Sequence, residues 1–192
     1  MKAKLGIFVL VTGLLMSIAV QAGPKTGNPV VVIKTSMGTM EAVLYKDKAP
    51  ISVDNFVKYV KAKFFDGTVY HRVIPNFMIQ GGGFDADLKR KATRGPIKNE
   101  ADNGLKNERG TLAMARTSDV NSATAQFFIN LKHNKFLDHG SRDFGYAVFG
   151  RVTKGMEVME KIAKVKTGRK GPLPRDVPQQ TVLIESIRLK TK

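Results

Sequence analysis

The sequence predicts a mainly β domain, either an antiparallel barrel or a sandwich, with two helices at its ends. About eight short segments have the β-branched and apolar residues of strands, and two have apolar residues at helical spacing. Regular alternation of strands and helices is absent, which argues against a parallel sheet. The 192 residues suit one compact domain, with no internal repeat and no interdomain linker.

The first half of the chain predicts four strands and one helix. Segments 29–35 and 39–44 are apolar and β-branched around a turn-like Ser-Met-Gly, which indicates a hairpin. Pro50 suits the first turn of a helix that continues to residue 63. Two further strands, 68–74 and 77–82, meet at Pro75-Asn76.

The second half predicts a long polar loop, four strands and the second helix. The loop covers 84–109, and loops of that length within a compact domain are usually functional or mobile. A Pro/Gly-rich connection is predicted at 168–180. The other expected elements are strands 111–115, 126–130, 144–152 and 181–189 and a helix at 152–165.

Residues 1–22 have the three-part layout of a secretory signal peptide. Lys2 and Lys4 precede an apolar run, and Val20-Gln21-Ala22 places short residues at the cleavage site. An uncleaved anchor is the alternative, but the run is shorter than the ~20 residues of a membrane-spanning helix. We therefore expect a signal peptide at 1–22, a folded domain at 23–192, periplasmic localisation and no stable membrane insertion.

The chain is strongly basic and has no Cys. Its net charge is +16, and removal of 1–22 takes away two Lys and no acid, which leaves +14. Such a charge raises the possibility of nucleic-acid binding, but export argues against a specific nucleic-acid partner. The basic clusters 89–91 and 164–170 are interpreted as solvated loops that could still attract anionic envelope polymers or acidic client proteins.

Several common chemistries find no support in the sequence. The run Gly81-Gly82-Gly83 lacks a phosphate-loop pattern and is interpreted as a backbone bend or bulge. The three His lack metal-binding spacing, and Ser has no nucleophile motif. His71 lies in an apolar strand, where a hydrogen-bonded structural histidine is expected. We predict no metal site and no cofactor.

The segment from Tyr70 to Gly82 is the most informative. Counting outward from Asn76 places Arg72 opposite Gln80, whose amide oxygen could accept a hydrogen bond from the guanidinium. The alternative is an Arg whose stem packs while its head reaches water. In segment 125–130, Gln126 and Phe128 share one strand face, opposite to Phe127 and Ile129. That face would present an amide beside an aromatic surface.

Together these residues resemble the cyclophilin family over about residues 30–189. The likeness is carried by 70–82, by Gly-Thr-Leu-Ala-Met-Ala at 110–115, by Gln-Phe-Phe-Ile at 126–129, by Phe-Leu-Asp at 136–138 and by Phe-Gly-Arg-Val at 149–152. The pattern Asp-His-Gly at 138–140 followed by Asp-Phe-Gly-Tyr at 143–146 is similar to the bacterial periplasmic branch.

The resemblance implies a closed eight-stranded antiparallel barrel capped by two helices, with a groove for X–Pro peptides. It implies a peptidyl-prolyl cis/trans isomerase that acts on proline-containing unfolded or nascent exported polypeptides. Arg72 matches the catalytic arginine and Gln80 its supporting amide. The proline pocket is matched by Phe77, Met78, Phe128 and Leu137, and positions that hold the peptide backbone are matched by Ala115, Arg116 and Gln126.

Four positions depart from the pattern of many eukaryotic members. Phe136 replaces Trp and Tyr146 replaces His, at two further positions that the resemblance implies bind substrate; Arg116 replaces Asn and Asn76 replaces Gly. The Phe136 change predicts weak or no cyclosporin binding, and Arg116 is expected to make the groove rim more basic. Asn tolerates left-handed backbone geometry, so the turn at Asn76 should persist.

Two other functions are compatible with the sequence. The same groove could serve a non-catalytic holdase for unfolded exported proteins, and the charge could serve a polyanion-binding adhesin. A refolding assay on a client without limiting prolines would separate holdase activity from isomerase activity. Salt-sensitive retention on heparin that survives Arg72→Ala would support polyanion binding. In each case we expect a monomer.

Overall fold

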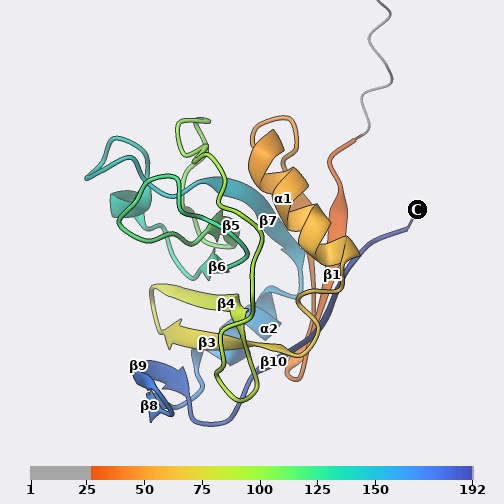
Figure 1. The fold of residues 1–192 in the computed structure, drawn as a ribbon, viewed down its shortest axis with the longest axis vertical. Helices are drawn as coiled ribbons and strands as arrows, with labels where there is room; N and C mark the ends of the chain where they lie inside the picture. Colours follow the sequence, from red (N-terminus) through yellow and green to blue (C-terminus); the bar gives the residue numbers. More distant parts are fainter. Residues whose placement is uncertain (1–26, 192) are drawn as a thin grey trace, which may run out of the picture.

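Eight strands close into an antiparallel barrel in the computed structural model, which describes residues 27–191 (Figure 1). Their spatial order is β1-β10-β3-β4-β6-β5-β7-β2, and β1 pairs with both β10 and β2, so this sheet has no free edge. The structure thus decides for the barrel over the sandwich. The predicted signal peptide lies outside the described residues. The barrel strands are β1 (Val30–Thr35), β2 (Gly38–Leu44), β3 (Thr68–Ile74), β4 (Met78–Asp85), β5 (Thr111–Met114), β6 (Phe127–Asn130), β7 (Val148–Lys154) and β10 (Leu183–Leu189).

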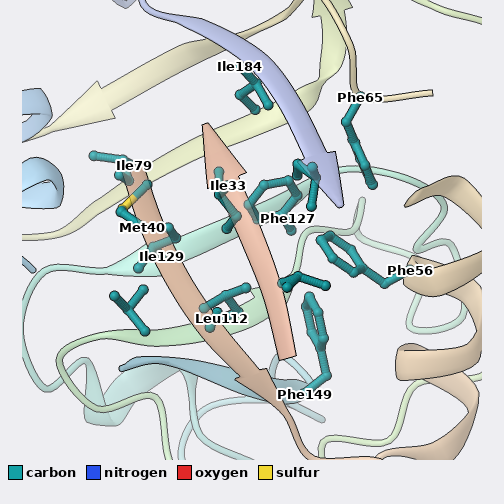
Figure 2. Close-up of a cluster of buried hydrophobic side chains, with 14 of the residues drawn as sticks. Ile33, Met40, Phe56, Phe65, Ile79, Leu112, Phe127, Ile129, Phe149 and Ile184 are labelled. Carbon is teal, nitrogen blue, oxygen red and sulfur yellow. The ribbon is translucent and has the colours of Figure 1, made fainter. Parts of the chain in front are cut away.

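The core fills the inside of the barrel. Successive strand residues point to opposite faces, so Met40, Ala42 and Leu44 of β2 are fully buried while Val43 between them is only half-buried. Figure 2 shows such inward side chains from several strands, together with Phe56 and Phe65 from the segment between β2 and β3. The labelled members are Ile33, Met40, Phe56, Phe65, Ile79, Leu112, Phe127, Ile129, Phe149 and Ile184.

Helix α1 (Pro50–Lys61) begins at the predicted Pro and inserts Phe56 among aromatic core side chains. The Phe56 ring centroid lies 5.0–5.3 Å from those of Phe65, Phe127 and Phe149. The helix N-terminus is bound by Glu100 from the long loop, whose two carboxylate oxygens accept hydrogen bonds from the backbone N–H groups of Ile51 and Ser52 at 3.0 and 2.7 Å. This part of the predicted loop therefore has a structural role.

Helix α2 (Met156–Ala163) starts later than its apolar spacing predicts. Strand β7 continues to Lys154, and Gly155 then turns the chain with φ +80°. A Cβ at Gly155 would lie 2.3 Å from the carbonyl oxygen of Thr39, so the close approach of the β2 backbone requires glycine here. The helix starts only after this turn. Neither helix in the described range is long and apolar enough to cross a bilayer.

The glycine run lies inside β4, which extends three residues beyond its predicted end at residue 82. The pairing of β3 with β4 shifts register on both sides of Tyr70, opposite the glycines, and Gly82 has φ +79°. The predicted bulge is confirmed. Bulges of this kind let a closed barrel bend sharply.

The predicted connection at 168–180 is instead a two-stranded hairpin of β8 (Thr167–Lys170) and β9 (Leu173–Pro178). Lys170 stabilises it by donating from Nζ to the Gln179 carbonyl at 3.0 Å and to Thr181 Oγ1 at 2.8 Å. Val177 is buried in a small apolar cluster with Val69 of β3. The hairpin thereby lies beside β3, as Figure 1 shows.

Candidate active site

The site lies on the outer face of the barrel, where four strands present one row of neighbours. Arg72 of β3 is paired with Gln80 of β4, Gln80 with Phe128 of β6, and Phe128 with Ala113 of β5. Residues directly opposite in an antiparallel pair share a face. The predicted opposition of Arg72 and Gln80 is confirmed, and the row extends from a cationic side chain to an apolar surface.

A cavity of about 180 Å³ opens over this row. It brings together nine of the eleven site residues named from the sequence. They are Arg72, Phe77, Met78, Gln80, Ala115, Arg116, Phe128, Leu137 and Tyr146. Its floor is apolar, since Met78, Phe128 and Leu137 belong to a second hydrophobic cluster outside the barrel core. The alternation that places Phe127 inside and Phe128 outside is confirmed.

The other two site residues lie beside the cavity. Gln126 lines an adjoining depression of about 240 Å³, together with Gln80 and Arg116. Phe136, exposed to 42%, stacks on Phe77 at 5.5 Å between centroids. Phe136 therefore supports the cavity rim through Phe77, and it does not line the cavity itself.

Arg72 differs from expectation in its polar partner. Its Nε lies 3.5 Å from Oδ2 of Asp176, on the hairpin that the sequence did not predict. Gln80 does not hold the guanidinium here. Its Nε2 donates to Oε1 of Gln126 at 3.0 Å; Gln126 lies two residues before Phe128, the residue opposite Gln80 in β6, and both amides line the same depression. The expected Arg72–Gln80 hydrogen bond is therefore wrong for this state.

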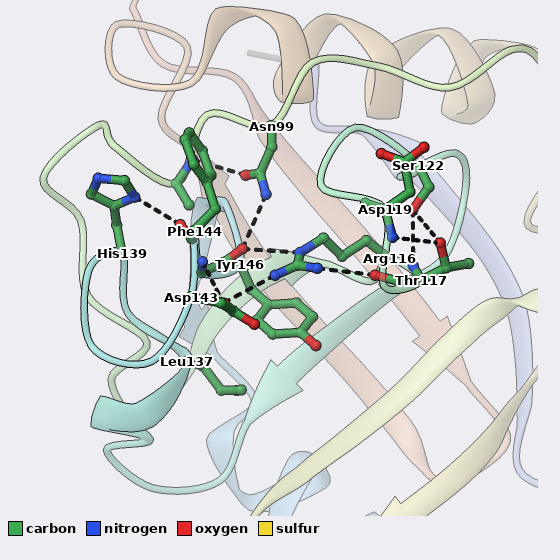
Figure 3. A network of polar contacts seen from close by, with 12 residues as sticks. Asn99, Arg116, Thr117, Asp119, Ser122, Leu137, His139, Asp143, Phe144 and Tyr146 are labelled. Atoms are coloured by element: carbon green, nitrogen blue, oxygen red, sulfur yellow. Dashed lines mark hydrogen bonds and ion pairs between the residues drawn. The ribbon is translucent and has the colours of Figure 1, made fainter.

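Arg116 also differs from expectation. Its side chain is only 4% exposed, and the guanidinium is folded into the loop that precedes β7 (Figure 3). It donates to the Gly145 carbonyl at 3.1 Å and pairs with Asp143 at 3.1 Å, and its Cζ lies 4.6 Å from the Tyr146 ring centroid. Because its charge is paired and covered, Arg116 does not make the rim basic as the sequence suggested.

The pKa of the Asp143 carboxyl is lowered in this network. The main cause is the backbone N–H of Gly145, which donates to Asp143 Oδ1 at 2.7 Å; partial burial opposes it, and the charge of Arg116 adds to it. Gly145 has φ +84°, and a Cβ there would lie 2.6 Å from the backbone nitrogen of His139. The loop is thus closely packed behind Tyr146.

A chain of buried amides connects the strands to the cavity wall. Asn107 donates from Nδ2 to the carbonyl of Leu137 at 3.0 Å and accepts at Oδ1 from Asn130 at 3.2 Å. Asn134 donates to Oδ1 of Asn130 at 2.7 Å and to the Phe77 carbonyl at 2.8 Å. Sequence reasoning missed these amides. The one local signal was Asn130, a polar residue that ends an apolar strand.

The turn between β3 and β4 is the expected one. Asn76 adopts φ +56°, in the left-handed region that Asn tolerates better than most residues. This tight turn keeps β3 and β4 in register, so the positions of Arg72 and Gln80 follow from it.

His71 is buried as predicted, but its Nδ1 has no hydrogen-bond partner, which corrects the expectation of a fully bonded histidine. Its ring packs against Phe84 with centroids 4.5 Å apart. The pKa of His71 is lowered to about 4, mainly by burial; the polar backbone of Val69 opposes this shift, and the charges of Arg72 and Arg90 add to it. His71 is therefore neutral near pH 7. No group of three or more His, Cys, Asp or Glu is arranged to hold a metal ion within 27–191.

The fold and the site define a class: a barrel protein with a cationic side chain beside an apolar, aromatic cavity on its outer surface. The family model described as cyclophilin type peptidyl-prolyl cis-trans isomerase/CLD matches residues 30–189. The chain is 54% identical to peptidyl-prolyl cis-trans isomerase A of Dickeya dadantii over 183 residues, which is 95% of this chain and 96% of that protein. It is 52% identical to isomerase B of Escherichia coli over 160 residues, or 82% and 97%.

Solved structures agree on the fold. A cyclophilin type isomerase of Cryptosporidium parvum superposes with a TM-score of 0.70 at 23% identity, covering 86% of this chain and 99% of that one. The chain belongs to the cyclophilin type peptidyl-prolyl cis-trans isomerase family, and it is a peptidyl-prolyl cis-trans isomerase.

Proposed function

We propose that this enzyme accelerates X–Pro rotation by holding the proline ring in the 180 Å³ cavity while the Arg72 guanidinium stabilises the twisted amide. The observation that carries the proposal is that Arg72 and the apolar side chains of Met78, Phe128 and Leu137 line one cavity. Aromatic and apolar walls accept a ring that has no donor of its own, and the cation lies at their edge.

The chemistry needs no covalent intermediate. Rotation breaks amide conjugation against a barrier of about 18–20 kcal/mol, and uncatalysed exchange takes roughly tens to hundreds of seconds. In the twisted state the prolyl nitrogen regains a localised lone pair, so a donor fixed beside it binds that state better than the planar one. Arginine suits this task because its guanidinium is planar and always charged.

The size of the effect follows from the strength of such a bond. A hydrogen bond from a charged donor is worth about 1.5–3 kcal/mol, which corresponds to about ten- to a hundredfold in rate. The rest of the acceleration is assigned to the grip on the ring and to the exclusion of water by the apolar walls.

The test is a protease-independent isomerase assay, with NMR exchange of a short X–Pro peptide as the readout. We expect Arg72→Ala to lower kcat/KM at least tenfold while thermal unfolding shows an intact fold. Arg109→Ala is the matched control, because Arg109 forms an ion pair with Glu160 on the protein surface and does not line the cavity. Turnover by Arg72→Ala close to that of the wild type would refute the proposal.

We further propose that the enzyme acts in the periplasm on proline-containing exported polypeptides. The layout of residues 1–22 supports this, as does the bacterial origin of relatives 52–54% identical. Cell fractionation and N-terminal sequencing test it, with Gly23 expected as the first residue of the mature chain. Recovery of the uncleaved chain from the cytoplasm would contradict it. The same proposal includes three further properties of the enzyme: weak or no cyclosporin binding, attraction to anionic envelope polymers and a monomeric state.

A further inference from the structure

We propose that Asp176 is a positioning residue for Arg72: its carboxylate holds the guanidinium in the orientation used at the proline cavity. This inference deepens the proposed function and rests on it, since it takes Arg72 as the catalytic group. Asp176 lies on β9, 104 positions along the chain from Arg72, so only the tertiary fold brings the two together.

The contacts place Arg72 between two surfaces. Arg72 lines the proline cavity, and it also lines a second depression of about 190 Å³. Asp176 lines only the second, with Oδ2 3.5 Å from Nε of Arg72. The carboxylate therefore reaches Arg72 from the hairpin side, and the proline cavity itself remains open.

The hairpin fixes the position of the carboxylate. The neighbouring Val177 is 2% exposed and packs with Val69 of β3, which ties β9 to the strand that carries Arg72. Asp176 itself has φ +62°. A non-glycine residue in the left-handed region carries a conformational cost, and the surrounding structure must maintain it. Here the packing of Val177 against Val69 and the hydrogen bonds of Lys170 maintain this conformation.

An arginine without a partner samples many rotamers, and this freedom must be given up when the guanidinium binds the twisted amide in the transition state. A carboxylate at Nε removes part of that freedom beforehand, which lowers the barrier and raises kcat. The Asp176 carboxylate also contacts Arg175 at 3.8 Å, but that side chain is 81% exposed and competes weakly. The side chains of Arg72 and Asp176 are 40% and 26% exposed, so solvent screens the pair and the effect is moderate.

Two substitutions remove the carboxylate without disturbing the backbone. Both Asp176→Asn and Asp176→Gly accept positive φ, and Asn also keeps the shape of the side chain. We expect each to lower kcat about two- to fivefold, with KM nearly unchanged because Asp176 does not line the cavity. Asp87→Asn is the matched control, since Asp87 is an exposed acid paired only with Lys89 at 3.9 Å.

A structural role alone would not depend on Arg72, so the second measurement is a double-mutant cycle. In an Arg72→Lys background, Asp176→Asn should change kcat by less than 1.5-fold, on the order of experimental scatter, because Lys has no Nε donor at that position. A loss of the same size in both backgrounds would overturn the inference. So would a wild-type or increased kcat in Asp176→Asn.

A third readout is independent of turnover. In ¹⁵N-labelled protein, the Nε–H resonance of Arg72 should exchange with water faster in Asp176→Asn than in wild type, while Arg109 is unchanged. Equal exchange in both proteins would overturn the inference even if kcat fell. The two proposals fail separately: full activity of Arg72→Ala refutes the catalytic role, whereas low activity of Arg72→Ala with full activity of Asp176→Asn refutes only the positioning role.

Discussion

The guanidinium of Arg116 stacks on the ring of Tyr146, with Cζ 4.6 Å from the ring centroid. Tyr146 also meets the ring of Phe128 edge to face at 5.7 Å. Phe128 is part of the cavity floor and Tyr146 part of its wall. Arg116 thus lines the cavity and also supports its Tyr146 wall, with a side chain that is only 4% exposed.

The first prediction concerns this stack. Arg116→Ala should lower the free energy of unfolding by about 2–3 kcal/mol, because it removes a cation–π contact and charged hydrogen bonds from a buried site. For a chain of this size that corresponds to about 5–10 °C in Tm. KM for an X–Pro peptide should rise, because the Tyr146 wall loses its support. Thermal denaturation and steady-state kinetics measure both.

Arg116→Lys should not restore either property. Its ammonium cannot reach the carbonyls of Thr117 and Gly145 and the carboxylate of Asp143 in the planar arrangement that the guanidinium uses. Full rescue by lysine would show that charge alone suffices, against the stacking interpretation. Arg109→Ala again provides the surface control.

The second prediction is a pH dependence of stability that originates at His71. The pKa of this side chain is lowered in the folded protein to about 4, against an ordinary value of about 6.5. Between these values the unfolded chain binds a proton at His71 and the folded chain does not. The contribution of His71 to the free energy of unfolding is therefore fully present above about pH 6.5. It is lost as pH decreases toward 4, by about 3 kcal/mol in total.

Urea unfolding of the wild type and of His71→Phe, from pH 4 to 8, measures this contribution. The substitution keeps an aromatic ring against Phe84 and removes the titrating group. The stability of His71→Phe should be flatter between pH 6.5 and pH 4. The carboxyls with lowered pKa values, Glu41, Asp66 and Asp143, contribute alike in both proteins, so the difference between the two curves isolates His71. Parallel curves for the two proteins would contradict the assignment to His71.

The third prediction concerns the buried amide chain. Asn107 is fully buried, and Asn107→Ala would leave the Leu137 carbonyl bonded only to the Tyr146 N–H and the Asn130 amide nitrogen bonded only to Thr111 Oγ1. We expect a loss of about 2–3 kcal/mol in unfolding free energy from the lost buried hydrogen bonds and the space left by the side chain. KM should also rise, because the backbone of Leu137 at the cavity loses one of its hydrogen bonds.

Asn28→Ala is the matched control, because its amide oxygen accepts one exposed hydrogen bond from Lys46 at 3.0 Å. It should cost less than about 1 kcal/mol, as is usual for exposed sites. Equal losses in the two variants would show that the Asn107 network adds nothing specific to stability or to the cavity.

Local patterns sufficed for the elements that lie close together along the chain. Arg72 and Gln80 face each other because the three-residue loop 75–77, centred on Asn76, fixes the register on both sides, and counting outward needs no other part of the molecule. Likewise, Phe127 and Phe128 must point to opposite faces of any strand. The family resemblance then linked these segments into one barrel.

The sequence by itself determined the mainly β class, both helices, the alternation that fills the barrel and nine residues that line one cavity on its outer face. Only the tertiary structure decided which polar groups hold those residues: Asp176 beside Arg72, Arg116 beneath Tyr146 and Asn107 behind Leu137. The physical reason is that strand faces and tight turns are set by neighbouring residues, whereas these partners come from segments 30 to 104 positions apart that meet only when the barrel closes.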